Sequence, residues 1–336
     1  MKFKLVNTEF GRHMAPTISI AIPCKFIDNY TSECIQHCLE LDYPNFEVLV
    51  LPDAPATYPN AKVKIIPTGD VKPPVKRNRA WEIAAGEIIA YLDSDSYPAK
   101  DWLKRAVKYF EDPQVWAVGG PGVTPPTDNL MQKASGLIMS TPICSGNACI
   151  RYKPIGSTRE VVDWITCNFL IRRSALAEIG GFDPSFWPGD DSQICNEIVR
   201  RGRKILYAPD LLVYHHRRSL FREHLKQVGR FGWQRGRFVW LYPETSRKPI
   251  YFLPSIFVVC LIVGTILSFF YPIVHSIYLL IVAGYALGVL ASAVKIGGKL
   301  FPLVWLGIVL THIVYGLRFM QGLIAGRQPA HLQRES

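Results

Sequence analysis

The chain has 336 residues, enough for one large domain with an appendage or for two domains. Its formal net charge of +11 is unevenly spread, because residues 201–249 hold 12 Lys and Arg against 3 Asp and Glu, whereas residues 1–200 hold 21 against 23. The basic stretch lies directly before the most apolar part of the chain. It therefore predicts contact with anionic membrane lipids rather than with nucleic acid.

The cysteines and the first residues indicate a reducing compartment. The eight cysteines form no CxxC pair and no Cys/His cluster with the spacing of a zinc site, so they are expected to be small buried side chains. Residues 1–17 contain no apolar stretch of signal-peptide length. The large N-terminal part is therefore expected to stay in the cytoplasm.

Apolar strands and amphipathic helices alternate along the first hundred residues. Strands are predicted at 17–23, 46–52, 61–67 and 87–92, and helices at 30–41 and 75–86. This order predicts an open α/β sheet with helices on both faces, in which ligands bind beyond the carboxyl ends of the strands. Three strands end in polar groups at that edge: Pro23-Cys24-Lys25, Asp53, and Asp93-Ser94-Asp95.

The D-x-D of Asp93 and Asp95 directly follows the apolar strand at 88–92. Charges at the end of a buried strand are costly unless they are paired. Carboxylates are hard oxygen ligands, so Asp95 is expected to hold Mg²⁺ or Mn²⁺, which would in turn hold a diphosphate. A lone D-x-D is also common in solvated turns, so this interpretation depends on the rest of the sequence.

The second hundred residues end in a helix and a strand. The segment GDDS favours a helix start, because acids stabilise that end, and SQICNEIVRRG continues as a helix to Gly202. The apolar run ILYAPDLLVY is predicted to be one strand, followed by His215 and His216. The segment 217–240 then has the pattern of a basic amphipathic helix lying on a membrane.

The last part of the chain is predicted to enter the membrane. The runs 250–271 and 272–294 lack Lys, Arg, Asp and Glu, and each can cross ~30 Å of hydrocarbon. A third run, 301–317, either spans or lies along the interface. Flanking Lys and Arg place the N-terminal domain on the cytoplasmic side. His312 and Arg318 lie in or beside this third run, where they are either functional polar groups at membrane depth or structural ones. In the structural alternative, His312 forms a hydrogen bond between helices and the Arg318 side chain reaches the headgroups.

Five segments in order resemble family 2 glycosyltransferases, which have the GT-A fold. The resemblance covers about residues 17–215. The segments are ISIAIP, YPNFEVLVLPDA, RNRAWEIAAGEIIAYLDSDSYP, CNFLIRRSALAEIGGFDPSF and GDDSQICNEIVRRG. The chain departs from the usual family motifs in having CKFID after the first strand, PDAP after the second, and Asp190 in place of a Glu. The resemblance implies a Rossmann-like, nucleotide-binding open mixed sheet.

The resemblance also implies a donor site. It would be formed by Pro23, Asp53, Arg77, Asp93 and Ser94. Asp53 would contact the nucleotide base and Asp93 the ribose, while Asp95 would bind the metal. In related enzymes a His near position 215 can be a further metal ligand; the alternative for His215 is an interfacial role beside His216.

The implied reaction is displacement at the anomeric carbon of a nucleotide-diphosphate sugar. A metal, helped by Arg77 or Arg230, would neutralise the leaving diphosphate. Asp191 would take the proton of the incoming hydroxyl, which gives direct attack and inversion. Asp190 would shape the acceptor pocket or the electrostatics of the base, since adjacent acids repel and one pKa can rise.

Contacts to the acceptor are also implied. Gln227 and Arg230 match a QxxRW motif that helps to hold the acceptor or the diphosphate in some members, with Phe231 in place of Trp. Trp164 and Trp187 flank the expected acceptor region, where they either stack on a sugar or belong to the core and its rim.

The sequence thus predicts a catalytic domain (1–215), an interfacial segment (216–249) and a membrane domain of two or three helices (250–326). The predicted function is an inverting glycosyltransferase of the plasma membrane that moves a sugar from a UDP- or GDP-type donor to a polyprenyl-linked saccharide, in surface polysaccharide or glycan synthesis. The segment THIVYGLRFMQGL also resembles the tail of exopolysaccharide glycosyltransferases of the succinoglycan type. The alternatives are a polyprenyl-phosphate glycosyl synthase and a non-catalytic membrane scaffold that binds nucleotide sugar.

Overall fold

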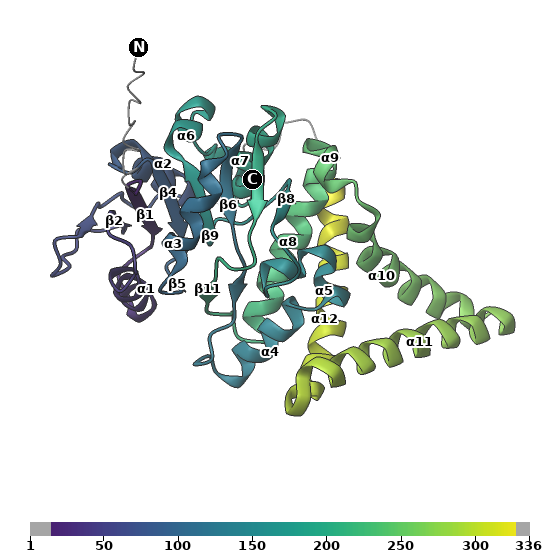
Figure 1. Ribbon diagram of the computed structural model, residues 1–336. Helices are drawn as coiled ribbons and strands as arrows, with labels where there is room; N and C mark the ends of the chain where they lie inside the picture. The colour runs from purple at the N-terminus through teal and green to yellow at the C-terminus, as the bar shows by residue number, and fades with distance from the viewer. Residues whose placement is uncertain (1–14, 327–336) are drawn as a thin grey trace, which may run out of the picture.

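The computed structural model describes residues 15–326, and its centre is an eight-stranded mixed sheet (Figure 1). Its strands are β1 (Ile18–Pro23), β2 (Phe46–Leu51), β3 (Val63–Ile65), β4 (Ile88–Leu92), β6 (Val115–Gly119), β8 (Arg159–Val161), β9 (Asn168–Arg172) and β10 (Lys204–Tyr207). They are ordered β3-β2-β1-β4-β9-β6-β10-β8. β1 runs parallel to β2 and β4, whereas β9 is antiparallel to β4 and β6. The predicted open mixed α/β sheet is confirmed.

Helices cover both faces of this sheet because its central strands are apolar on both sides. One core packs α1 (Asn29–Leu39) and α3 (Trp102–Ala106) against the sheet. The other face carries α2 (Pro73–Ile83), α6 (Arg173–Ile179) and α7 (Asp190–Arg200). The strand ends between these two layers form the edge where the functional residues gather.

A small second sheet corrects one prediction. The run ILYAPDLLVY is not one strand, because the chain turns where Leu211 N–H donates to Ala208 O at 3.2 Å. β10 stays in the large sheet, whereas β11 (Val213–His215) joins β5 (Ser96–Pro98) and β7 (Gly122–Val123). In the antiparallel β11–β5 pair, His215 lies opposite Ser96. The turn therefore brings His215 next to the D-x-D.

Long helices follow the second sheet. α8 (Arg222–Leu241) packs along α12 (Phe301–Ala325), while α10 (Pro249–Ser268) and α11 (Pro272–Gly297) form a hairpin that projects away from the sheet (Figure 1). Two helical stretches, Pro249–Ser268 and Pro272–Ala325, are long and apolar enough to cross a membrane. The turn η4 (Gly298–Leu300) divides the second stretch into α11 and α12.

The structure shows the surroundings of residues on α8, of His312 and of the cysteines. On α8, Val228 is buried and Phe231 is exposed. His312 hydrogen-bonds to the Tyr285 hydroxyl at 2.8 Å and to Ile143 O at 2.9 Å, which confirms that it joins helices. All eight cysteines are free, and six of them are buried.

Glycines allow α8 and α12 to approach closely. A Cβ on Gly322 would lie 2.0 Å from Trp233 O, and one on Gly236 would lie 2.2 Å from Phe319 O. Both obstacles are backbone atoms, so no side chain can move aside. Small residues of this kind are typical of tight helix pairs in membranes.

We expect Gly322→Ala to lower the apparent melting temperature by several degrees, because overpacking costs about 1–3 kcal/mol. Gly284→Ala in α11 is the matched control, since a Cβ there meets nothing within 4 Å. Thermal unfolding of both variants in the same detergent checks this. Equal melting temperatures would show that the α8–α12 contact does not require glycine.

Candidate active site

Three ligand-type side chains meet at the carboxyl end of β4. Asp93, Asp95 and His215 each offer one ligand atom, and these atoms lie within 4.8 Å of one another. His215 Nε2 is 3.2 Å from Asp95 Oδ1, and Arg218 Nη2 is 3.0 Å from Asp95 Oδ2. Two carboxylates and an imidazole are donors that suit Mg²⁺ or Mn²⁺. The buried His215 Nδ1 has no hydrogen-bond partner within the described residues, so this nitrogen is available to a ligand.

The surroundings keep Asp95 ionised. Burial alone would raise the pKa of Asp95, but His215 and Arg218 lower it below its usual value. Burial lowers the pKa of His215, yet the Asp95 carboxylate outweighs this and raises it to about 10. Burial raises the pKa of Asp93, with Arg77 opposing it. Asp95 is thus the anionic centre of the cluster.

The expected donor edge lies along β2, β1 and β4, which are neighbours in the sheet. Pro23 ends β1 opposite Leu51, and Asp53 follows β2. Asp53 forms an ion pair with the buried Lys76, whose Nζ also donates to Cys24 O at 2.7 Å. Lys76 thus connects Cys24, which follows β1, to Asp53, which follows β2. The sequence alone did not indicate this role for Lys76. Ser94 is partly buried between the two acids of the D-x-D.

Arg77 connects the candidate metal ligand Asp93 to Asp190. Its Nη1 is 2.5 Å from Asp190 Oδ2, and its Nη2 is 3.4 Å from Asp93 Oδ1. Arg77 and Asp190 are both buried. The guanidinium therefore balances the charge of Asp190 and part of the charge of Asp93.

Arg77→Ala should destabilise the fold by about 3–5 kcal/mol, because it leaves the Asp190 carboxylate buried without a cation. Arg79→Ala on the same helix should cost only about 0–1 kcal/mol, since its pair with Glu82 is on the surface. Denaturant unfolding of both variants checks the difference. A loss of equal size would mean that the buried ion pair adds nothing beyond a surface one.

Asp190 and Asp191 stand in the first turn of α7, as GDDS predicted, but their environments differ. Asp191 accepts the Ser192 N–H at 2.8 Å, and among residues 15–326 no cation forms an ion pair with it. Burial, Asp190 and Asp163 raise the pKa of Asp191 to about 7. A carboxylate that titrates near neutral pH is suited to general base catalysis.

A cavity of about 650 Å³ connects these acids to the long helices. Its polar wall includes Arg77, Asp93, Asp190 and Asp191. Its apolar wall includes Leu253, Pro254 and Phe257 of α10, Tyr285 of α11 and Tyr315 of α12. The acidic residues and the long apolar helices therefore line the same cavity.

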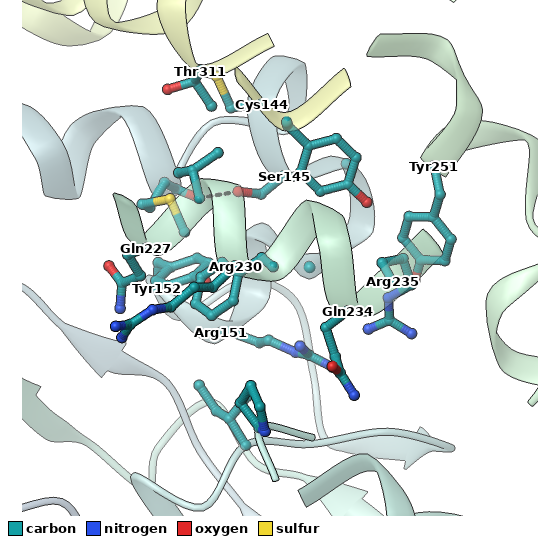
Figure 2. Close-up of a pocket in the computed structure, with 18 of the residues that line it drawn as sticks. Cys144, Ser145, Arg151, Tyr152, Gln227, Arg230, Gln234, Arg235, Tyr251 and Thr311 are labelled. Atoms are coloured by element: carbon teal, nitrogen blue, oxygen red, sulfur yellow. Dashed lines mark hydrogen bonds between the residues drawn. The ribbon is translucent and has the colours of Figure 1, made fainter. Parts of the chain in front are cut away.

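The expected acceptor residues lie on this cavity. Gln227, Arg230 and Trp187 all line it. Figure 2 shows Gln227 and Arg230 projecting from α8 into the space that Arg151 and Tyr152 also enter. Trp164, by contrast, is 1% exposed and packs against Tyr207, so it belongs to the core.

Sequence reasoning missed an ion cluster on the same wall. Asp163 Oδ2 is 3.1 Å from Arg151 Nη2 and 3.2 Å from Arg235 Nη2, and Asp163 Oδ1 accepts the Ser192 hydroxyl at 2.9 Å. Burial raises the pKa of Asp163, but Arg151 and Arg235 outweigh this and lower it to about 2. The cluster attaches α8 to the first turn of α7. Its members lie far apart in the chain, so no local pattern indicates it.

Comparison with known proteins agrees with this geometry. The chain matches the family model "Glycosyltransferase like family 2" over residues 15–236. It is 23% identical over 253 residues to "Dolichyl N-acetyl-alpha-D-glucosaminyl phosphate 3-beta-D-2,3-diacetamido-2,3-dideoxy-beta-D-glucuronosyltransferase" of Methanococcus voltae, covering 67% of this chain and 77% of that one. It is 24% identical over 261 residues to "Glycosyltransferase AglE" of Haloferax volcanii, covering 71% and 79%.

A solved structure has the same fold. It is the mannosyltransferase PcManGT from Pyrobaculum calidifontis in complex with GDP-Man and Mn²⁺, which aligns with a TM-score of 0.54 at 19% identity over 92% of this chain and 88% of that one. This similarity supports the GT-A architecture. Since the family model covers more than half of the sequence, the chain belongs to glycosyltransferase family 2.

Proposed function

We propose that this protein is an inverting, metal-dependent glycosyltransferase that moves a sugar from a nucleotide-diphosphate donor to a polyprenyl-linked saccharide. The observation that carries the proposal is the cavity that joins Asp191 and Asp93 to the apolar side chains of α10 and to the tyrosine rings of α11 and α12. A soluble acceptor needs no apolar passage, whereas a prenyl chain does. The pathway would be surface polysaccharide or glycan synthesis.

The related proteins support the substrate classes. The name of the Methanococcus voltae protein describes a dolichyl-linked sugar phosphate, and the Pyrobaculum structure holds GDP-Man and Mn²⁺. For this chain we infer a UDP- or GDP-type donor with Mg²⁺ or Mn²⁺. The donor would contact Pro23, Asp53, Arg77, Asp93 and Ser94.

The chemistry divides between two groups of residues. Asp95, Asp93 and His215 would hold the divalent ion, which supplies positive charge to the leaving diphosphate when it is bound. The acceptor hydroxyl attacks the anomeric carbon from the side opposite the diphosphate, and Asp191 accepts its proton. Attack from that side inverts the configuration of the anomeric carbon. Asp190 is paired with Arg77, and its proximity helps to raise the pKa of Asp191.

The acids favour a hydroxyl nucleophile over a phosphate. A polyprenyl-phosphate glycosyl synthase attacks with an ionised phosphate, which needs no base and would be repelled by the carboxylates at 190 and 191. A non-catalytic scaffold gives no reason for a carboxyl beside the cavity whose pKa is raised by burial and by two neighbouring acids. Gln227, Arg230 and Trp187 would contact the acceptor at the other side of the cavity.

We place the protein in the plasma membrane. The catalytic domain (1–215) would face the cytoplasm, residues 216–249 would lie at the interface, and residues 250–326 would cross the bilayer more than once. The apolar stretches Pro249–Ser268 and Pro272–Ala325 support membrane attachment. The Lys and Arg that flank them support the orientation.

Sugar transfer by the purified protein tests the proposal. Radiolabelled UDP- and GDP-sugars are incubated with Mn²⁺ and either a polyprenyl-diphosphate-linked saccharide, the free saccharide or polyprenyl phosphate, and the labelled product of each acceptor is separated by chromatography and measured. We expect transfer that requires the lipid-linked saccharide and stops with EDTA. Equal transfer to the free saccharide, or to polyprenyl phosphate alone, would contradict the assigned acceptor.

A further inference from the structure

Arg217 is a buried cation whose side chain has only neutral partners. It is 8% exposed. Its Nε donates to the Thr124 hydroxyl at 3.2 Å, its Nη2 donates to Gly122 O, and its guanidinium lies over the Tyr152 ring at 5.1 Å. Within residues 15–326, no carboxylate oxygen comes within the 4.0 Å of an ion pair with this guanidinium. The nearby Asp128 instead accepts the backbone N–H of Arg217 at 3.1 Å.

Other arginines on the same cavity wall differ from Arg217 in this respect. Arg77 pairs with Asp190, and both Arg151 and Arg235 pair with Asp163. A buried charge is costly unless it is paired. Burial lowers the pKa of Arg217, and Asp128 and Asp95 act on its charge only from beyond ion-pair distance, so this charge is compensated only in part. The missing counter-charge is therefore expected to come from a ligand.

The cavity shows where such an anion would sit. Arg217 and Tyr152 both line it. Burial raises the pKa of Tyr152, whereas the charges of Arg151 and Arg217 lower it, so both guanidiniums lie near the phenol. From there the cavity continues to the apolar side chains of Pro254 and Phe257 on α10. An anion bound at Arg217 thus has an apolar passage beside it.

We propose that Arg217 binds a phosphate group of the lipid-linked acceptor. The planar guanidinium matches the geometry of phosphate oxygens, and an anionic head joined to an apolar chain fits this wall and this passage together. The inference rests on the proposed function, because it names the anion that the same acceptor carries. The diphosphate of the donor is the other source of phosphate, but that group would be held at Asp95, where Arg218 supplies the cation.

Binding by the full chain in detergent separates the two sources. The probes are farnesyl phosphate, the uncharged farnesol, and UDP or GDP with Mn²⁺, each titrated against tryptophan fluorescence, since Trp187 lines the cavity. We expect Arg217→Gln to bind farnesyl phosphate about tenfold more weakly while farnesol and nucleotide binding stay unchanged. Arg217→Lys should keep most of the affinity. Arg222→Gln is the matched control, because Arg222 is exposed in the first turn of α8.

The outcomes are distinct. Farnesyl phosphate binding by Arg217→Gln at wild-type affinity, in a wild-type enzyme that transfers sugar, overturns the inference and leaves the proposed function intact. A loss of nucleotide binding alone also overturns it and assigns the phosphate to the donor. If Arg217→Gln does not fold, loss of the phosphate preference over farnesol in folded Arg217→Lys supports the proposal, and an unchanged preference overturns it. A wild-type chain that shows the phosphate preference but transfers no sugar contradicts only the proposed function.

Discussion

Asp191→Asn should reduce the rate of sugar transfer by a factor of about 10²–10⁴, the usual contribution of a positioned general base. Asparagine has the same shape but cannot take a proton from the attacking hydroxyl. Donor binding should be unchanged, because Asp191 is not among the donor contacts proposed above. Transfer to a polyprenyl-linked saccharide, together with the affinity for nucleotide and Mn²⁺, measures both. Glu197→Gln, farther along α7 and paired with Arg201, is the control.

The pH dependence gives an independent check on the same residue. Below pH 7 Asp191 is mostly protonated and cannot act as a base, and above it the carboxylate is ionised, because burial and Asp190 raise its pKa to about 7. The wild-type rate should therefore rise with pH through about 7. This rise should be missing from Asp191→Asn. A wild-type rate that is flat between pH 5 and 8 would contradict the assignment of the base.

Asp95→Asn should weaken Mn²⁺ binding at least about a hundredfold, because even residues that only support a ligand cost 10–100-fold. Asparagine keeps the volume but removes the charge that His215 and Arg218 now share. Electron paramagnetic resonance of free and bound Mn²⁺ measures the affinity without any turnover. Asp101→Asn, whose carboxylate pairs only with Arg105 on the surface, should bind Mn²⁺ like the wild type. Unchanged affinity in Asp95→Asn would contradict the metal site.

Much of the nucleotide-binding half could be predicted because its signals are local. β1, β2 and β4 are predominantly apolar runs, and they lie within a residue or two of the predicted limits. β9 could not be placed from sequence, since it pairs with both β4 and β6 across long segments. The division of ILYAPDLLVY was missed because apolar residues stand on both sides of Pro209 and Asp210.

The same distinction holds for the candidate site. The D-x-D and the GDDS segment are short motifs, so Asp95 and Asp191 could be singled out from sequence. The raised pKa of Asp191 could not, because it depends on burial in the folded chain and on Asp163, which is far from Asp191 in the sequence. Arg217 looked like one of many basic residues before α8. Only its burial among neutral groups separates it from the solvated ones.

The tight glycine contact between α8 and α12 has a consequence for engineering. A shortened version that stops before α8 would keep the strand ends that hold nucleotide, yet it would lack one side of the reaction chamber. Such a fragment should hydrolyse or bind donor at best. If the long helices lie in a bilayer as proposed, this attachment would also fix the height of the carboxylates above it, and an acceptor would be extended only when its lipid presents the sugar at that level.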